Sequence, residues 1–239
     1  MPPGALGIAF NHVFGDQALE RDVFYATAAG EQVQVNLLQY YISNIKLRRS
    51  NGTMYVVPAD SSYFLIRETQ PESLGLTLKN VPAGSYNGIA FMIGVDSARS
   101  RMGLAQRRGV LDVADEQTGQ GMYWTWNSGY IFYRIEGYCP QSTMELKSKR
   151  SFLYHVGGYG GTDSARSVNN LRVVSLALPA ALVVKRGVQP KIHVQHDVKK
   201  VWGGPNVISI AENPMAHFNT WSANVANNYA TGFTVTHVE

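Results

Sequence analysis

The sequence contains one cysteine, Cys139, in 239 residues. A single cysteine excludes an intramolecular disulfide framework and any zinc site of the CxxC…CxxC type. Charged residues are also scarce, at 16% of the chain, whereas apolar residues reach 45%. This composition excludes a disordered chain and supplies enough apolar material for a core. No run of about 18 apolar residues occurs, so the sequence predicts no transmembrane helix.

Motifs that indicate enzymes or nucleic-acid binding are missing as well. The net charge of +4 neither clusters nor alternates with aromatic residues, so nucleic acid is not an expected partner. There is no HExxH, and no GxSxG nucleophile elbow; the glycine-rich run 157–161 is not followed by the Lys-Ser/Thr of a phosphate-binding loop. Cys139 precedes Pro140 and has no basic neighbour that would lower its pKa. We therefore predict no catalytic residues and no enzymatic activity.

The residues that are plentiful favour strands. Gly, Tyr, Val, Thr and Asn are common while Glu and Lys are few, which suits short strands joined by turns. The clearest hairpin joins 33–49 to 54–57, because Asn51-Gly52 supplies the positive φ that a tight turn needs. No internal repeat or linker-like segment interrupts the chain. We predict an all-β fold with long loops over residues 1–239, arranged as one Greek-key sandwich or barrel domain.

Other segments follow from periodicity. Further strands are expected at 8–13, 63–67, 74–78, 86–95, 122–136, 151–156, 171–178, 191–196 and 233–238. The only helix expected is a short C-terminal one within 213–229, where Met215, Phe218, Trp221 and Val225 have helical spacing. Between 96 and 121 the periodicity lapses into a polar stretch with Arg99, Arg101, Arg107 and Arg108. Ordered loops of this length are often functional.

Two of the six histidines lie among strand aromatics: His12 follows Phe10-Asn11, and His155 lies within Phe152 to Val156. A lone strand histidine is more often a hydrogen-bonded structural residue than a ligand, at odds of about four to one. His193 and His196 are three residues apart, which places them on opposite faces of a strand. That pair is weak evidence for a metal.

The segment from Met122 to Tyr130 is the most unusual in the chain, because it contains the tryptophan pair Trp124 and Trp126. In a strand these two rings share one face. The ordinary interpretation is a core anchor. Two functional interpretations are a platform for stacking carbohydrate and an oxidisable aromatic beside a metal.

Several segments together resemble the MbnP-like family of copper-associated proteins. They are Phe10 to His12, Tyr40 to Leu47, Val81 to Tyr86, Gly94 to Ala98, Met122 to Gly137 and Phe152 to Gly158, and Asn227 to Val238 is similar to the family's usual ending. Each piece alone is ordinary, but the ordered set is specific. The family is found paired with a di-haem enzyme of the MauG and cytochrome c peroxidase type.

The resemblance implies an exported protein, periplasmic or at the cell surface, that holds one copper ion as Cu(I) in copper homeostasis. The partner oxidises the first tryptophan of the W-x-W motif, here Trp124, to kynurenine. The given chain begins Met-Pro-Pro-Gly and carries no signal-peptide pattern. Imidazole is a good copper ligand, so His12 and His155 are the expected metal ligands, with Met122 as a possible soft ligand and Trp126 adjacent to the metal.

This chain departs from some members of the wider family, which carry four cysteines, because it has only Cys139. Because the other cysteines are missing, loop structure and partner specificity cannot be carried over in detail from the family to this chain. A rival hypothesis from another class is a carbohydrate-binding or adhesion module, non-catalytic, in which Trp124, Trp126 and Tyr130 form the stacking platform. Glycan binding that survives metal removal would separate it from the copper hypothesis.

Overall fold

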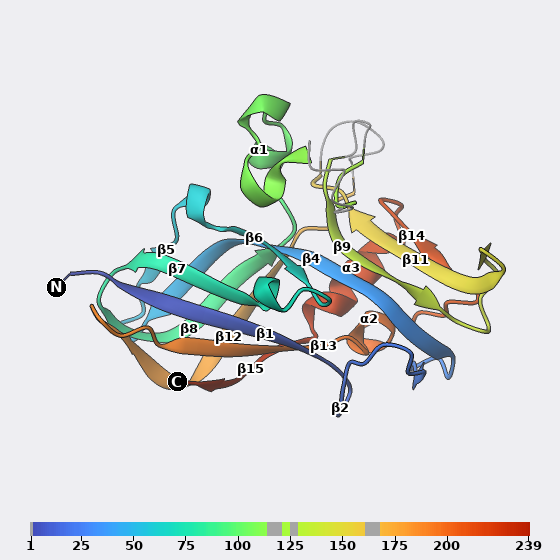
Figure 1. Cartoon of the computed structure of the whole chain (residues 1–239), viewed down its shortest axis with the longest axis horizontal. Coiled ribbons are helices and arrows are strands. Elements are labelled where there is room, and N and C mark those ends of the chain that lie inside the picture. Colours follow the sequence, from blue (N-terminus) through green and yellow to red (C-terminus); the bar gives the residue numbers. More distant parts are fainter. Residues whose placement is uncertain (1, 114–120, 125–128, 161–167) are drawn as a thin grey trace.

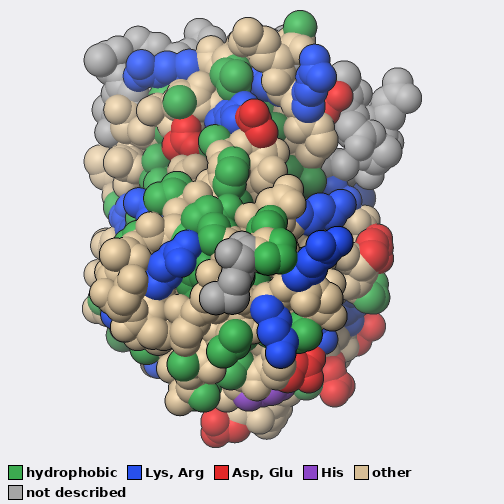
Figure 2. All heavy atoms as spheres, turned by 90° about the vertical axis from the view of Figure 1, so that its left-hand side faces the viewer, with side chains coloured by type: hydrophobic (Ala, Val, Ile, Leu, Met, Phe, Trp, Pro, Cys, Tyr) green, Lys and Arg blue, Asp and Glu red, His purple; other side chains and the backbone are tan. Residues whose placement is uncertain are grey.

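The computed structural model describes residues 2–113, 121–124, 129–160 and 168–239 (Figure 1). The protein is built mainly from strands, which form two open sheets. Both termini lie at the same end of the molecule, at the left of Figure 1. On the face shown in Figure 2, Lys and Arg side chains are scattered among hydrophobic and other side chains.

The smaller sheet has five strands, with β1 (Gly4–Phe14) at its centre. Its order is β15-β13-β1-β2, and β7 also pairs with β1. The β1 and β13 strands are parallel, with His12 in register with His196. The remaining bounds are β2 (Gln17–Ala18), β7 (Gly75–Val81), β13 (Lys191–Asp197) and β15 (Phe233–Val238).

The larger sheet has ten strands around β4 (Gln32–Arg49). Its main order is β10-β11-β9-β4-β8-β12; β14 pairs with β11, while β3, β5 and β6 pair with β4. The other bounds are β3 (Tyr25–Ala26), β5 (Met54–Val56), β6 (Tyr63–Arg67), β8 (Gly84–Ile93), β9 (Ile131–Tyr138), β10 (Glu145–Leu146), β11 (Lys149–Gly157), β12 (Arg172–Val184) and β14 (Met215–Ala216).

Both faces of the larger sheet are covered by apolar side chains. Tyr40 and Tyr133 belong to the main core shared with the smaller sheet, whereas their neighbours Tyr41 and Phe132 belong to a second cluster. Because successive strand residues point to opposite faces, the second cluster lies on the face turned away from the smaller sheet. We call the two sides of the larger sheet the inner face and the outer face.

The helices in the described part of the chain are short. They are α1 (Ser97–Ser100), α2 (Lys200–Gly203) and α3 (Ser222–Ala230), together with the 3-10 turns η1 (Ala59–Ser61), η2 (Pro71–Leu74), η3 (Leu104–Gln106) and η4 (Gly109–Leu111). In the part of the chain that the structure describes, no helix has the length and apolarity needed to cross a membrane. The segment from α1 to η4 stands at the top of Figure 1.

The structure confirms a mostly β protein and corrects the barrel alternative, since neither sheet closes on itself. The Greek-key connection and the single domain stay predictions. The Asn51-Gly52 turn is as expected: Gly52 has a φ of 88° and β4 pairs antiparallel with β5. Strands β6 and β15 have the predicted bounds.

Two predicted elements are wrong in extent. The strand expected at 122–136 begins only at Ile131, because Tyr123 forms an isolated antiparallel bridge with Tyr130. The expected C-terminal helix begins at Ser222, and Met215 lies in β14 instead. Met215 is 43% exposed on β14, which pairs with β11, whereas Val225 is buried in α3, so these apolar residues do not share one helical face.

Candidate metal centre

Two histidines lie side by side on the outer face of the larger sheet. His155 is on β11, and His217 follows directly after β14. The two strands pair in parallel with Tyr154 opposite Ala216. The residues that follow these two, His155 and His217, are therefore neighbours as well. The two imidazole rings are 5.7 Å apart, centroid to centroid. Figure 1 shows β11 and β14 adjacent at the right of the molecule.

A carboxylate fixes the orientation of His155. The Nε2 atom of His155 lies 2.6 Å from Oε1 of Glu136 on the neighbouring strand β9. Arg134 Nε donates to the same oxygen at 2.6 Å. Burial raises the pKa of Glu136, but the hydrogen bond from His155 and the charge of Arg134 outweigh it and hold that pKa below its usual value. Glu136 is therefore ionised at neutral pH, and Nε2 of His155 carries a proton.

His217 is a neutral imidazole whose Nδ1 atom is not used in a hydrogen bond to the described residues. Burial lowers its pKa, and the neighbouring His155 lowers it further. Its Nδ1 is buried and has no hydrogen-bond partner among the described residues. Leaving a buried polar atom unpaired costs about 1–3 kcal/mol. A neutral imidazole nitrogen of this kind is a competent ligand for a soft metal ion.

Trp124 packs against His217 of this pair. Its ring meets the ring of His217 edge-on at 6.4 Å and that of Phe218 at 5.3 Å. The position of the indole depends on Gly157 at the end of β11. A Cβ atom there would lie 2.6 Å from Cζ3 of Trp124 and 2.6 Å from the carbonyl oxygen of Tyr130. The missing side chain at 157 is therefore what lets the benzo ring of Trp124 lie on the strand.

Gly157→Ala is expected to displace Trp124 from His217. The added methyl group cannot be accommodated by the backbone of Tyr130, so the indole must move. We expect a red-shifted tryptophan emission and a loss of about 1–3 kcal/mol in the free energy of unfolding, which is typical of overpacking. Gly75→Ala is the matched control, since a Cβ atom at Gly75 meets nothing within 4 Å. Unchanged emission from Gly157→Ala would show that this close approach does not position the indole.

Two other predicted residues have different surroundings. Met122 is only 2% exposed and belongs to the outer apolar cluster with Tyr41 and Tyr130. Trp126 lies outside the described residues. The prediction that Trp124 and Trp126 share one face of a strand therefore also lies outside the described residues. The backbone N–H of Trp124 donates to the carbonyl oxygen of Gly129 at 3.1 Å.

His12 lies elsewhere, between the two sheets. Its Nε2 is 3.0 Å from the hydroxyl of Tyr40 on β4. Its neighbour in register, His196, is fully buried and its Nε2 is 2.8 Å from the hydroxyl of Tyr133. Burial lowers the pKa of His12 to about 4 and lowers that of His196 as well. These four side chains form a buried polar group on the inner face.

The structure therefore does not bring His12 and His155 together. His12 reaches Tyr40, which faces inward, and Tyr133 pairs across the strands with Val156, which is also in the main core. His155 is adjacent to Val156 and points to the other face of the sheet. One ion cannot contact both imidazoles. Trp124 contacts His217, and His217 is the histidine that lies beside His155.

The sequence offered little that would have selected His217. It is one of six histidines, and the two-residue strand before it has no periodicity of its own. Its proximity to His155 depends on pairing between segments about 60 residues apart. His193 and His196 do face opposite sides of β13, as predicted: His193 stacks on His237 at 3.9 Å, and His196 stacks on Phe233 in the core.

The donor set suits a metal that accepts few ligands. Among the described residues, no three His, Cys, Asp or Glu side chains converge in a metal-binding arrangement. Cys139 is buried and free, and burial raises the pKa of its thiol. Two neutral imidazoles are too few for a typical structural zinc site, which has four ligands. They fit Cu(I), for which soft or imidazole donors suffice.

Comparisons with known proteins agree with this architecture. The family model described as MbnP matches residues 3–221. A solved structure, "MbnP from Methylosinus trichosporium", is similar over 88% of this chain and 80% of that chain, with a TM-score of 0.59 and 15% sequence identity. At this identity the likeness shows the shared fold. Among curated proteins, none matches the sequence.

Proposed function

Because the chain belongs to the MbnP family, we propose that it is an exported, non-catalytic protein that holds one copper ion as Cu(I) beside Trp124. The observation that carries the proposal is the placement of two imidazoles, His155 and His217, in register on adjacent strands with Trp124 edge-on to one of them. Copper supplies a soft centre that these donors can bind. The physiological role is copper homeostasis at the periplasm or cell surface.

Each residue of the site has a distinct role. His217 offers its unpaired Nδ1, and its lowered pKa keeps the imidazole deprotonated. Glu136 accepts a hydrogen bond from Nε2 of His155 and leaves Nδ1 of that ring as the nitrogen for the metal. Met122 as a soft ligand stays a prediction. His12 as a ligand also stays a prediction, and its partner would be His196 rather than His155.

Trp124 is the residue that a di-haem partner oxidises to kynurenine in this proposal. An intact indole has only an N–H donor and cannot bind the ion. Oxidative cleavage of the indole ring, with oxidising equivalents from the partner's haems, exposes a ketone and an aromatic amine. The reaction breaks the C2–C3 bond and places one oxygen atom on each carbon, with the oxygen supplied by a peroxide or dioxygen co-substrate of the partner. Water then removes the N-formyl carbon as formate, so the side chain loses one carbon and gains one oxygen overall. The close packing of Trp124 on His217 would place the new polar groups beside the ligands.

Single substitutions test the ligand pair. In protein co-expressed with its di-haem partner, His155→Ala and His217→Ala are each expected to weaken Cu(I) binding at least about 100-fold, more than the loss typical of an outer hydrogen-bond partner. Competition against a chromophoric Cu(I) chelator measures this. His12→Ala and His237→Ala are the matched controls and should retain copper. If His12→Ala lost copper while His155→Ala kept it, the result would contradict this ligand pair and place the copper site on the inner face.

The mass of the Trp124 peptide tests the modification separately. The copper proposal expects the kynurenine mass only when the partner is co-expressed. The carbohydrate-binding alternative requires an available aromatic platform, whereas Trp124 packs against Gly157, His217 and Phe218. It stays a prediction, and glycan binding that survives copper removal would support it instead.

A further inference from the structure

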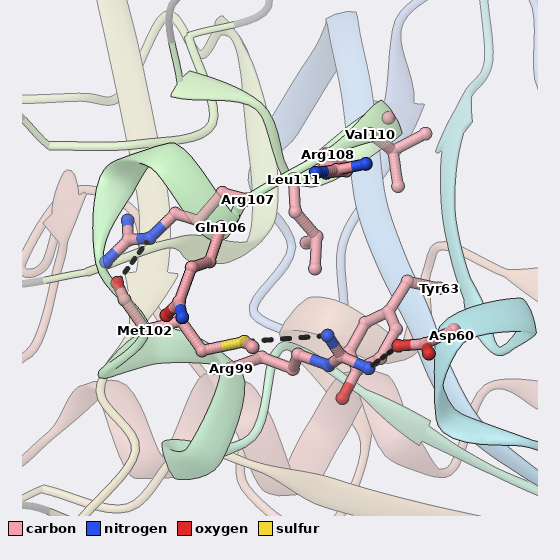
Figure 3. Close-up of a pocket in the computed structure, with 10 residues that line it drawn as sticks. Asp60, Tyr63, Arg99, Met102, Gln106, Arg107, Arg108, Val110 and Leu111 are labelled. Atoms are coloured by element: carbon pink, nitrogen blue, oxygen red, sulfur yellow. Dashed lines mark hydrogen bonds and ion pairs between the residues drawn. The ribbon is translucent and has the colours of Figure 1, made fainter.

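A hollow lies in the arginine-containing segment between residues 96 and 121. It has a volume of about 520 Å³ and is formed between that segment, from α1 to η4, and the stretch from η1 to β6. Figure 3 shows Arg99 extending toward Asp60 and Tyr63, with Arg107, Arg108 and Leu111 above it. Small-molecule sites commonly have volumes of about 300–1,000 Å³. A bare inorganic ion would leave most of this space unfilled.

The lining carries an excess of positive charge. Arg99, Arg107 and Arg108 line the hollow, and among the described residues of the lining Asp60 is the one acidic residue. Asp60 forms an ion pair with Arg99, but 87% of its side chain is exposed. Arg99 is only 20% exposed, but its partner faces solvent, and a solvent-facing carboxylate is a weak competitor for another anion because surface ion pairs contribute little. The described residues of the wall therefore keep a net positive charge whether or not that pair is formed.

The nearby carboxylate of Asp96 does not neutralise these arginines. It accepts hydrogen bonds from the Tyr63 hydroxyl, from Asn44 Nδ2 at 3.0 Å and from the backbone N–H of Arg99 at 3.1 Å. Burial raises its pKa, but these bonds together hold that pKa below its usual value. Asp96 is thus ionised and fully used in starting α1 and holding Tyr63. The guanidinium groups remain the recognition groups of the hollow.

The arginines are positioned in different ways. Arg107 is 8% exposed, donates to the carbonyl oxygens of Met102 and Ser100, and lies over the ring of Tyr123 at 4.9 Å. It acts as a fixed positive charge in the wall. Among the described residues, Nη1 of Arg99 donates to the sulfur of Met102 at 3.5 Å, which is a weak acceptor. Arg108 is exposed at the rim. Arg99 and Arg108 can therefore offer N–H groups to a ligand.

Apolar groups complete the lining. Val110 and Leu111 line the hollow, as does Tyr63, whose ring lies under the Arg99 guanidinium at 5.4 Å. Leu111 is 6% exposed and is part of the outer apolar cluster. We propose that this hollow binds a small organic anion, with a carboxylate or phosphate head on Arg99 and Arg108 and an apolar, ring-sized body against Val110, Leu111 and Tyr63. Arginine suits such heads because its planar group makes paired hydrogen bonds.

Benzoate and phenyl phosphate are the probes for the full-length protein, and calorimetric titration or ligand-observed NMR measures their binding. Either anion should bind, while neutral benzamide of the same size should not. Arg108→Gln and Arg99→Gln should each weaken binding about 10- to 100-fold, the loss expected when a charged hydrogen bond is removed. Arg108 is exposed, so its variant is not expected to disturb folding.

Arg101→Gln is the matched control. Arg101 is an exposed arginine of the same segment that lies over the ring of Tyr159 and not in the hollow's lining. Equal weakening by Arg101→Gln would show that general charge, not the hollow, attracts the anion. Equal binding of benzamide, or no binding of either anion at millimolar concentration, would also overturn the proposal. The copper ligands His155 and His217 are not part of this lining, so their variants should bind benzoate normally.

Discussion

Copper-free protein is expected to lose stability steadily as the pH falls from about 6.5 toward 4.5. The main cause is the inner-face pair of His12 and His196, which are buried as neutral imidazoles, and His217 on the outer face adds to it because burial lowers its pKa as well. Burial lowers the pKa of His12 from 6.5 to about 4 and lowers the pKa of His196 too. In the unfolded chain both titrate near 6.5. Below that pH the unfolded state binds protons that the folded state does not, so unfolding becomes more favourable.

The size of the stability loss follows from how far the pKa of each histidine is lowered in the folded state. Each histidine that is protonated only in the unfolded state changes the free energy of unfolding by about 1.4 kcal/mol per pH unit. For His12 alone the loss approaches about 3 kcal/mol by the time the pH nears 4. Carboxylates with lowered pKa values, such as Glu136 and Asp96, also stabilise the folded state. They lose this contribution to the free energy of unfolding only at lower pH, as they become protonated. The window between 6.5 and 4.5 therefore isolates the histidines.

Urea unfolding with a copper chelator present, at several pH values, measures the slope. His12→Gln keeps a side chain that can hydrogen-bond to Tyr40 but cannot take up a proton, so it should remove the contribution of one histidine from the slope. His237→Gln at the exposed edge is the control and should leave the slope unchanged. A His12→Gln slope equal to that of the parent protein would contradict the burial of a neutral His12.

Asn228→Asp is expected to destabilise the protein by at least about 3 kcal/mol, through two lost hydrogen bonds and a buried charge. Asn228 is fully buried in α3. Its Nδ2 donates to the carbonyl oxygens of Val201 at 3.0 Å and Asn206 at 2.6 Å, and its Oδ1 accepts from the backbone N–H of Asn206 at 2.9 Å. Aspartate has nearly the same shape but offers an acceptor where two carbonyls require a donor.

The melting temperature should fall by about 6–12 °C, given the usual scaling for a chain of this length. Asn224→Asp is the control because Asn224 is an exposed residue of the same helix. Copper binding should weaken together with stability, since Asn170 Nδ2 links Ser222 of α3 to the carbonyl oxygen of Gly157 beneath Trp124. A melting temperature like that of Asn224→Asp would show that the Asn228 amide does not hold α2 and α3 together.

Local pattern was enough to place most strands. The alternation in β6 and β15, and the Asn51-Gly52 turn, depend on residues that are near in sequence, and the observed bounds agree. The local pattern gave a wrong strand start between 122 and 130. The aromatic residues there are typical of a strand, but Tyr123 and Tyr130 form an isolated antiparallel bridge with each other. Periodicity reports which side chains share a face; it does not report where a strand begins.

The sequence by itself determined that this protein is built from strands, that Cys139 forms no disulfide within the chain, and that His155 and Trp124 belong to family-like segments. Only the tertiary structure decided that His155 meets His217 and that His12 meets His196. The physical reason is that a strand's partner and its inward face are set by long-range pairing and burial. A pattern of alternating residues is the same whichever of its faces is turned to the core.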